Sequence, residues 1–233
     1  MESWPLAIQR LIDTYGDKAE VMVPGHGAPG GMDLPRHTLE MLRKQQFLFY
    51  LHGRIVEDQG IHAISDEYGP YQYEAIVETL EEHGFKVLSE ARPKDTDPME
   101  YAQKVAAQIK QLRLGGVPAG NITVVGASKG AGITALISDL LEDEDEINYV
   151  LLAICSPMML DLWQTRDICV RGNVLSIFDE KDKLAGSCRE FFRLCEGSGL
   201  RGHREVELKV GTGHGIVYQP LEEWIGPLLE WVK

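Results

Sequence analysis

The chain has 233 residues, 44% of them apolar and 25% charged, and this composition fits one sizeable α/β domain, alone or with an extension. Its 36 acidic and 23 basic side chains give a formal net charge of −13, which argues against a nucleic acid or an anionic membrane as partner, because either would favour a basic face. No apolar run approaches the ~20 residues that span a bilayer, and Met1–Pro5 lacks the basic flank and apolar core of a signal peptide. We therefore expect a cytoplasmic protein.

The first 45 residues carry a pattern of their own. A short amphipathic helix is predicted from Trp4-Pro5, with an apolar face of Ile8, Leu11, Ile12 and Tyr15. A strand-like run then ends in Pro-Gly-His-Gly, and His37-Thr38 follows. A Trp-Pro helix, a strand ending in Pro-Gly-His-Gly and a His-Thr helix, in this order, resemble the C-terminal end of metallo-β-lactamases. We therefore assign residues 1–45 to a lactamase-like appendage and residues 46–233 to a separate domain.

The appendage is not expected to bind a metal. The resemblance matches His26 to a zinc ligand of that family, but the His-x-His-x-Asp segment that supplies other ligands far upstream has no counterpart in this sequence. One imidazole cannot make a zinc site that needs three or four ligands. No metal or cofactor is therefore predicted for the chain.

Strand-like runs alternate with helical periods from residue 46 to the C-terminus. Helices are predicted around residues 73–80, 101–112, 133–140, 188–195 and 221–232, where apolar residues repeat at three and four. This alternation predicts an α/β fold with a mostly parallel sheet and helices on both faces. The predicted strands are Phe47–Leu51, Phe85–Ser89, Asn121–Val125, Tyr149–Ile154, Val174–Phe178 and Glu205–Val210.

A glycine-flanked serine joins the third strand to the helix that follows it. The motif Gly126-Ala127-Ser128-Lys129-Gly130 follows a β-branched strand and opens an apolar-periodic helix. A strand that turns through glycines into a helix can hold a serine in a strained, exposed position at the helix N-terminus. Ser128 is therefore a candidate nucleophile, and the alternative is a serine that caps the helix.

A nucleophilic serine needs a base and a carboxylate that orients the base, and later strands supply candidates for both. Asp179, Glu180 and Asp182 follow the fifth strand, and His214 lies on a glycine-rich loop before the last helix. The carboxyl ends of parallel strands are where open α/β sheets place their sites. Ser128, an acid from this turn, and His214 are thus predicted at one edge of the sheet.

The order serine, acid, histidine resembles that of the α/β-hydrolase superfamily, and the resemblance covers residues 46–233. It implies an α/β-hydrolase fold, here without a large cap domain, and it favours Asp182 over Asp179, with Glu180 third, as the acid. The segment His52-Gly53 looks like the family's oxyanion segment, so His52 is expected to be structural. By the same resemblance, the backbone N–H groups of Lys129 and of Gly53 or Arg54 would bind the oxyanion.

Two features bear on the substrate. Lys129 stands where the family often has an aromatic residue or histidine, so its ammonium could favour acidic substrates or face solvent. The stretch from Cys155 to Gly172 could supply a small apolar wall or pack in the core, through Met158, Met159, Leu160, Leu162 and Trp163. We expect a small-molecule acyl substrate, with ester, thioester and amide bonds, and the oligomeric state, left open.

The sequence thus predicts an esterase-like serine hydrolase with Ser128, His214 and Asp182 as the triad. The first alternative is a non-catalytic binding protein of the same fold, and the second is a zinc-dependent β-lactamase fragment. The cysteines Cys155, Cys169, Cys188 and Cys195 lack C-x-x-C spacing and are expected to be free thiols in a reducing compartment.

Overall fold

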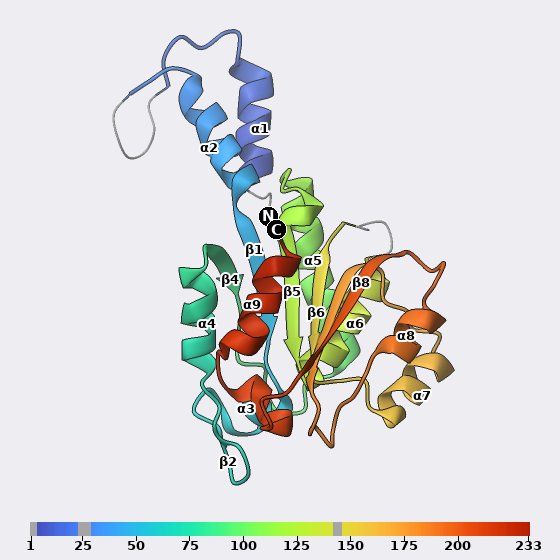
Figure 1. Ribbon diagram of the computed structural model, residues 1–233. Helices are drawn as coiled ribbons and strands as arrows, with labels where there is room; N and C mark the ends of the chain where they lie inside the picture. The colour runs from blue at the N-terminus through green and yellow to red at the C-terminus, as the bar shows by residue number, and fades with distance from the viewer. Residues whose placement is uncertain (1–3, 23–28, 142–145) are drawn as a thin grey trace.

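Six parallel strands form the central sheet of the structure, a computed structural model that describes residues 4–22, 29–141 and 146–233 (Figure 1). All six predicted strands are present. The largest difference is in β8, which begins at Leu200 rather than at Glu205, because an edge strand that is half exposed needs no continuous apolar run. In their order across the sheet, the strands are β4 (Phe85–Leu88), β1 (Gln46–Leu51), β5 (Ile122–Ala127), β6 (Asn148–Leu152), β7 (Gly172–Asp179) and β8 (Leu200–Leu208).

Helices cover both faces of the sheet, as predicted (Figure 1). Alternation along β1 divides the core, because Leu48 and Tyr50 pack on one face while Phe49 and Leu51 pack on the other. The first face is covered by α3 (Arg54–Gln59), α4 (Tyr73–Glu82) and α9 (Glu222–Trp231). The second face is covered by α5 (Pro98–Leu114), α6 (Lys129–Leu140), α7 (Pro157–Thr165) and α8 (Arg189–Leu194).

The strand order reverses direction beside β1, and this reversal places the site. The chain passes from β1 to β4 on one side and then crosses back to β5 on the other side of β1. At such a switch point the loops after the two strands diverge and leave a crevice at their carboxyl ends. His52 follows β1 and Ser128 follows β5, so both lie at this crevice. A small hairpin, β2 (Ile64–Ser65) with β3 (Gly69–Pro70), lies in the long connection after α3.

The N-terminal segment forms a helical arm that projects from the sheet domain (Figure 1). It contains the predicted helices as α1 (Trp4–Tyr15) and α2 (Asp33–Lys44), and α2 leads through Gln45 directly into β1. The side-chain amide of Asn121 donates to the backbone carbonyl of Arg43 at 2.9 Å, which fastens the end of α2 to the sheet domain. His26 lies outside the described residues, and the resemblance of residues 1–45 to metallo-β-lactamases stays a prediction.

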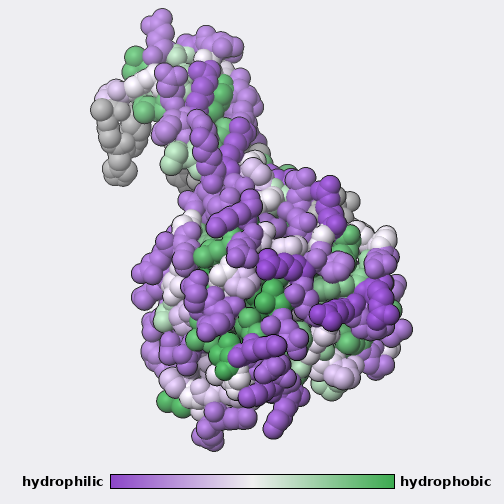
Figure 2. Space-filling view, in the orientation of Figure 1, coloured by the Kyte–Doolittle hydropathy of each residue, from purple (hydrophilic) through white to green (hydrophobic). Residues whose placement is uncertain are grey.

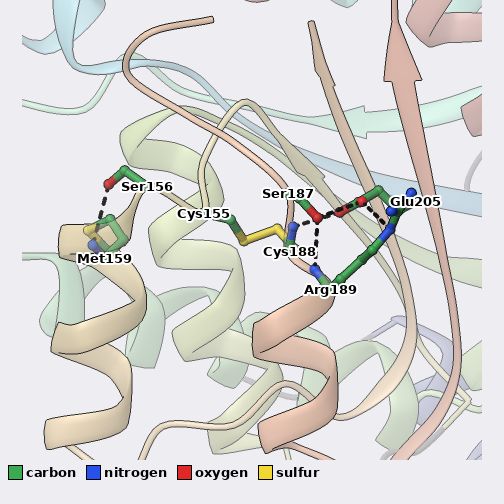
Figure 3. The surroundings of a disulfide bond; sticks show 7 residues. All are labelled: Cys155, Ser156, Met159, Ser187, Cys188, Arg189 and Glu205. Atoms are coloured by element: carbon green, nitrogen blue, oxygen red, sulfur yellow. Dashed lines mark hydrogen bonds and ion pairs between the residues drawn. A yellow bond between two sulfur atoms is a disulfide. The ribbon is translucent and has the colours of Figure 1, made fainter. Parts of the chain in front are cut away.

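The prediction that all four cysteines are free thiols is wrong for one pair. Cys155 and Cys188 form a disulfide, with Cα atoms 5.1 Å apart (Figure 3). Cys155 follows β6 and Cys188 precedes α8 in the connection after β7, so the adjacent parallel strands bring both residues to the same edge of the sheet. Spacing along the chain does not reveal this pairing, because the sheet creates it. Cys169 and Cys195 are free.

The surface viewed in Figure 2 is mostly hydrophilic, with hydrophobic side chains gathered in small patches near α9. Among the described helices, none is both long enough and apolar enough to cross a membrane.

Candidate active site

Ser128 occupies a strained turn between β5 and α6. Its backbone has φ 52° and ψ −115°, a region that residues with a side chain rarely adopt. Its N–H donates to the carbonyl of Leu152 at 2.9 Å, which holds the turn against β6. A Cβ atom on Gly126 would overlap the carbonyl of Gly130, and one on Gly130 would overlap the carbonyl of Leu51. Both glycines are therefore required because the strand, the turn and the helix approach one another closely.

The structure brings together the three residues predicted from separate strand ends. The Oγ atom of Ser128 lies 2.9 Å from Nε2 of His214. Nδ1 of the same imidazole lies 2.8 Å from Oδ2 of Asp182. His214 is buried at the start of the short helix η2 (Gly213–Tyr218), and Asp182 lies in the turn after β7. The three side chains form one continuous hydrogen-bonded chain.

The competing carboxylates of this turn occupy different positions. Asp182 binds the imidazole through Oδ2, and its Oδ1 accepts the N–H groups of Leu184 at 2.8 Å and Ala185 at 3.1 Å. These bonds fix the carboxylate in its orientation. Asp179 instead accepts only backbone N–H groups, and Glu180 is exposed at the surface. Of these three carboxylates, Asp182 is the one that contacts His214, and it is also the one that the family pattern favoured.

Asp179 links the two loops that carry the acid and the histidine. Its buried carboxylate accepts the N–H groups of Lys181 at 3.0 Å, Gly211 at 2.9 Å and Gly213 at 3.0 Å. Burial acts to raise the pKa of Asp179, but the backbone N–H donors outweigh burial and hold the pKa below its ordinary value. Asp179 thus holds together the residue before Asp182, which is Lys181, and the residue before His214, which is Gly213. The sequence offered Asp179 only as a rival acid, and its role in joining loops was not foreseen.

The predicted oxyanion donors differ in their availability. The N–H of Gly53 donates to the Tyr71 hydroxyl at 3.2 Å, and that hydroxyl lies 2.6 Å from the hydroxyl of Tyr50. Burial raises the pKa of Tyr71 to about 12, so the phenol stays neutral. Arg54 and Lys129 are the first residues of α3 and α6, where a backbone N–H has no acceptor within its own helix. Of the two alternatives in the His52 loop, Arg54 is the one whose backbone N–H has no acceptor among the described residues.

The Lys129 side chain takes a position that neither interpretation of the sequence described. Its ammonium donates to Glu57 at 2.5 Å and to the carbonyl of Thr96 at 2.8 Å. The buried Glu57 carboxylate also accepts the Nε–H of Arg92 at 2.7 Å. One carboxylate on α3 thereby connects the residue after Ser128 with the loop after β4. No local pattern in the sequence indicates this cluster, because its members are distant in the chain.

His52 is structural, as predicted. The backbone N–H of Arg92 donates to its Nε2 at 2.9 Å, and its Nδ1 lies 2.8 Å from the carbonyl of Gly53. Burial, together with the nearby Arg92 guanidinium, lowers the pKa of His52 to about 4, so the ring is neutral at physiological pH. The guanidinium also donates to the His52 carbonyl. His52 therefore shapes the loop that leads to Gly53 and Arg54.

A cavity of about 360 Å³ opens beside Ser128 between α6 and α7. The predicted apolar wall is present in part, since Met159, Leu162 and Trp163 line the cavity. Met158 is 76% exposed and Leu160 packs against the core. The remaining lining residues are Arg54, Pro98, Ser128, Lys129, Gly132, Ile133, Leu136, Ile154, Arg166 and Ile168.

Comparisons with known proteins support the fold. No family model matches the chain. Solved structures of similar fold include a YdeN-like hydrolase from Pectobacterium atrosepticum, with 14% identity, a TM-score of 0.53, and coverage of 84% of this chain and 96% of that protein. SOBER1 from Arabidopsis thaliana matches with 12% identity, a TM-score of 0.52, and coverage of 81% and 97%. Est1E from Butyrivibrio proteoclasticus, solved with ferulic acid, matches with 15% identity, a TM-score of 0.52, and coverage of 82% and 90%.

The fold is that of the α/β-hydrolases, as the sequence predicted. Its sheet is parallel, helices cover both faces, and the connection from β6 to β7 contains the single short helix α7 rather than a large cap domain. At these identities the likeness concerns the fold alone.

Proposed function

We propose that this protein is a serine hydrolase that cleaves a carboxylic ester or a related acyl bond through an acyl-enzyme intermediate. The observation that carries the proposal is the unbroken chain from Ser128 Oγ to His214, at 2.9 Å, and from His214 to Asp182, at 2.8 Å. A nucleophile, a base and an orienting carboxylate in this arrangement are the requirements of acyl transfer by serine. The strained turn at a helix N-terminus and the adjacent cavity give the serine access to a substrate.

In the first half-reaction, the Ser128 oxygen attacks the substrate carbonyl while Nε2 of His214 accepts the hydroxyl proton. Asp182 holds the opposite ring nitrogen and stabilises the imidazolium that forms. The tetrahedral oxyanion would accept hydrogen bonds from the backbone N–H groups of Arg54 and Lys129. His214 then donates its proton to the leaving alcohol, and the acyl group stays on Ser128.

In the second half-reaction, water attacks the acyl-enzyme while His214 accepts its proton, and His214 then returns that proton to the Ser128 oxygen as the acyl–oxygen bond breaks and the acid product leaves. Every proton transfer is assigned to a side chain of this protein, so the mechanism requires no cofactor. We refer below to Asp182 and His214 as the relay side of the site. The N–H groups of Arg54 and Lys129 form its oxyanion side.

A non-catalytic binding protein of the same fold is the alternative from a different functional class. Such a protein could dispense with the contact between Ser128 and His214 and with space for a substrate. Here the contact is within hydrogen-bond distance and a cavity adjoins it, and both observations favour the enzyme.

The proposal is tested with an active-site label and short ester substrates. Wild-type protein is expected to react with a fluorophosphonate probe at Ser128 and to hydrolyse p-nitrophenyl esters. Ser128→Ala should lose the labelling and nearly all turnover, whereas Ser198→Ala, a serine away from the site, should retain both. Turnover that persists in Ser128→Ala would overturn the assignment.

A further inference from the structure

The cavity beside Ser128 extends along α6, and two contacts establish in which direction. The Cε atom of Met159, near the start of α7, lies 3.8 Å from the position that a Cβ on Gly132 would take. Further on, the N–H of Arg171 donates to the Ser138 hydroxyl at 2.6 Å. The chain from α7 toward β7 therefore runs alongside α6 in the same direction, away from Ser128. The cavity between them follows α6 for about 12 Å, the rise from residue 128 to residue 136.

The walls of this cavity are apolar and its charged lining residues are all basic. Two of the three cations already have anionic partners, since the Lys129 ammonium contacts Glu57 at 2.5 Å and the Arg54 guanidinium lies 3.7 Å from Asp58. The third, Arg166, has no hydrogen-bonded or ion-paired partner for its guanidinium in the part of the chain that the structure describes.

Arg166 lies toward the end of the cavity that is remote from Ser128. It directly follows α7, after Met159 and Leu162 in the wall, and precedes Ile168, which lines the same cavity. Because the segment runs parallel to α6, Arg166 is placed between the level of Gly132 and the level of Ser138. A substrate chain that starts at the Ser128 oxygen would therefore pass apolar side chains first and reach the guanidinium last.

From this arrangement we infer that the acyl group of the substrate is an apolar chain that ends in a carboxylate, bound by Arg166. The substrate class is then a monoester, or another monoacyl derivative, of a medium-length dicarboxylic acid. The inference rests on the proposed function, because it takes Ser128 as the acyl acceptor. A guanidinium can bind a carboxylate through two parallel hydrogen bonds, which gives both charge and geometry to the recognition.

A local cation offsets the overall negative charge of the protein for such a substrate. A formal net charge of −13 repels an anion at long range, although salt screens this repulsion beyond about 8 Å. Within the cavity, an unpaired carboxylate would lose its hydration without compensation. Arg166, which is itself exposed to solvent, supplies a charged partner at that end of the cavity, and an ordinary fatty acyl chain of the same length would leave the guanidinium unused.

The test compares two esters that differ only at the far end of the acyl chain, p-nitrophenyl octanoate and the mono-p-nitrophenyl ester of octanedioic acid. Wild type should have the higher kcat/KM for the octanedioate. In Arg166→Gln the ratio of kcat/KM for the octanedioate to kcat/KM for octanoate should fall about two- to fivefold, the loss expected for an ion pair at an exposed arginine. Arg193→Gln, at an exposed arginine on α8, is the matched control and should keep the preference.

A variant with the opposite charge at position 166 provides a second test. Arg166→Glu should favour the p-nitrophenyl ester of an ω-amino acid of the same length over the octanedioate. If Arg166 only supports the end of α7, Arg166→Gln will lower the Tm and leave the octanedioate-to-octanoate ratio unchanged, and the inference is overturned. A wild-type enzyme that labels at Ser128 yet prefers octanoate also overturns it. Absence of both labelling and turnover would instead overturn the proposed function.

Discussion

The two sides of the site are held in place by different kinds of interaction. Next to the relay side, Asp179 accepts backbone N–H groups from two loops, and these donors carry no formal charge. Next to the oxyanion side, the buried Glu57 carboxylate accepts hydrogen bonds from Arg92 and Lys129, which are cations. In both places a carboxylate outside the proposed reaction contacts a segment that carries a residue of that reaction.

This difference determines what each side can tolerate. Removing a carboxylate from among N–H donors leaves polar groups that lack partners but leaves no unpaired charge. Removing Glu57 leaves Arg92 inside the protein without its counter-ion, and an uncompensated buried charge is among the most destabilising changes known. We therefore expect removal of the carboxylate beside the oxyanion side to cost more stability than removal of the carboxylate beside the relay side.

The largest loss of activity is expected from Asp182→Asn. An amide at this position can donate to the imidazole and favour the wrong tautomer of His214, and the equivalent change in other serine triads lowers kcat about 10⁴-fold. The Tm should stay close to that of wild type. Glu180→Gln, in the same turn but exposed, should be nearly silent in both kcat and Tm. If Asp182→Asn kept more than a tenth of the wild-type kcat, the relay side would not act as described.

The next largest effect on activity, and the largest on stability, is expected from Glu57→Leu. Its unfolding free energy in urea should fall by about 3–5 kcal/mol because Arg92 loses its buried counter-ion. Its kcat should fall about 10²- to 10³-fold if the oxyanion N–H groups move with Lys129 and α3. Glu74→Gln, an exposed glutamate on α4, serves as control. Loss of activity with an unchanged urea midpoint would contradict the prediction that Glu57 supports the fold as well as the reaction.

Asp179→Asn should have a smaller effect, and one that depends on pH. Because the pKa of Asp179 is lower in the folded protein than its ordinary value, its carboxylate stabilises the fold fully above the unfolded pKa. That contribution disappears as the pH falls through the folded pKa. The free energy of unfolding of the wild type should therefore exceed that of Asp179→Asn by about 1–3 kcal/mol near neutral pH. In acid the two free energies of unfolding should converge. Urea denaturation from neutral pH into the acid range measures this, and a constant difference would contradict it.

The smallest effect on activity is expected from the loss of the disulfide. The pair Cys155→Ala and Cys188→Ala releases a covalent tie between the connection after β6 and the one that carries Asp182. Stability should fall by about 3 kcal/mol, while kcat should change less than tenfold, because hydrogen bonds still hold Asp182 and His214. Cys169→Ala, at a free thiol, is the control. A large fall in kcat would show that the relay side depends on the disulfide.

The parts of the site that sequence could predict are those with a local signature. The strand before Ser128, the glycines around it and the helix after it lie within one short stretch of chain, and the structure has them as predicted. His214 was found because a glycine-rich loop after a strand is also a local pattern. Asp182 and Asp179 share one turn, so only the resemblance to a family ranked them, and their hydrogen bonds separate them.

The parts that sequence could not predict depend on contacts between distant segments. Glu57 lies 72 residues before Lys129 and 35 before Arg92, and nothing in its helix distinguishes it from a surface glutamate. The partner of Cys155 is likewise set by the neighbouring strands β6 and β7. The order and pairing of strands arise only when the chain packs. Local patterns therefore indicate the candidate reacting groups better than the residues that hold them in place.

The backbone conformation of Ser128 implies a trade-off between thermal stability and activity. A serine held at φ 52° adds of order 1–3 kcal/mol of strain, which glycine at the same position would not experience. Ser128→Gly should thus raise the Tm above that of wild type while abolishing turnover. Selection for heat resistance alone would be expected to discard the hydroxyl, and selection for turnover would be expected to keep the strain. If the proposed function is correct, the active protein is therefore not the most stable protein that its own fold allows.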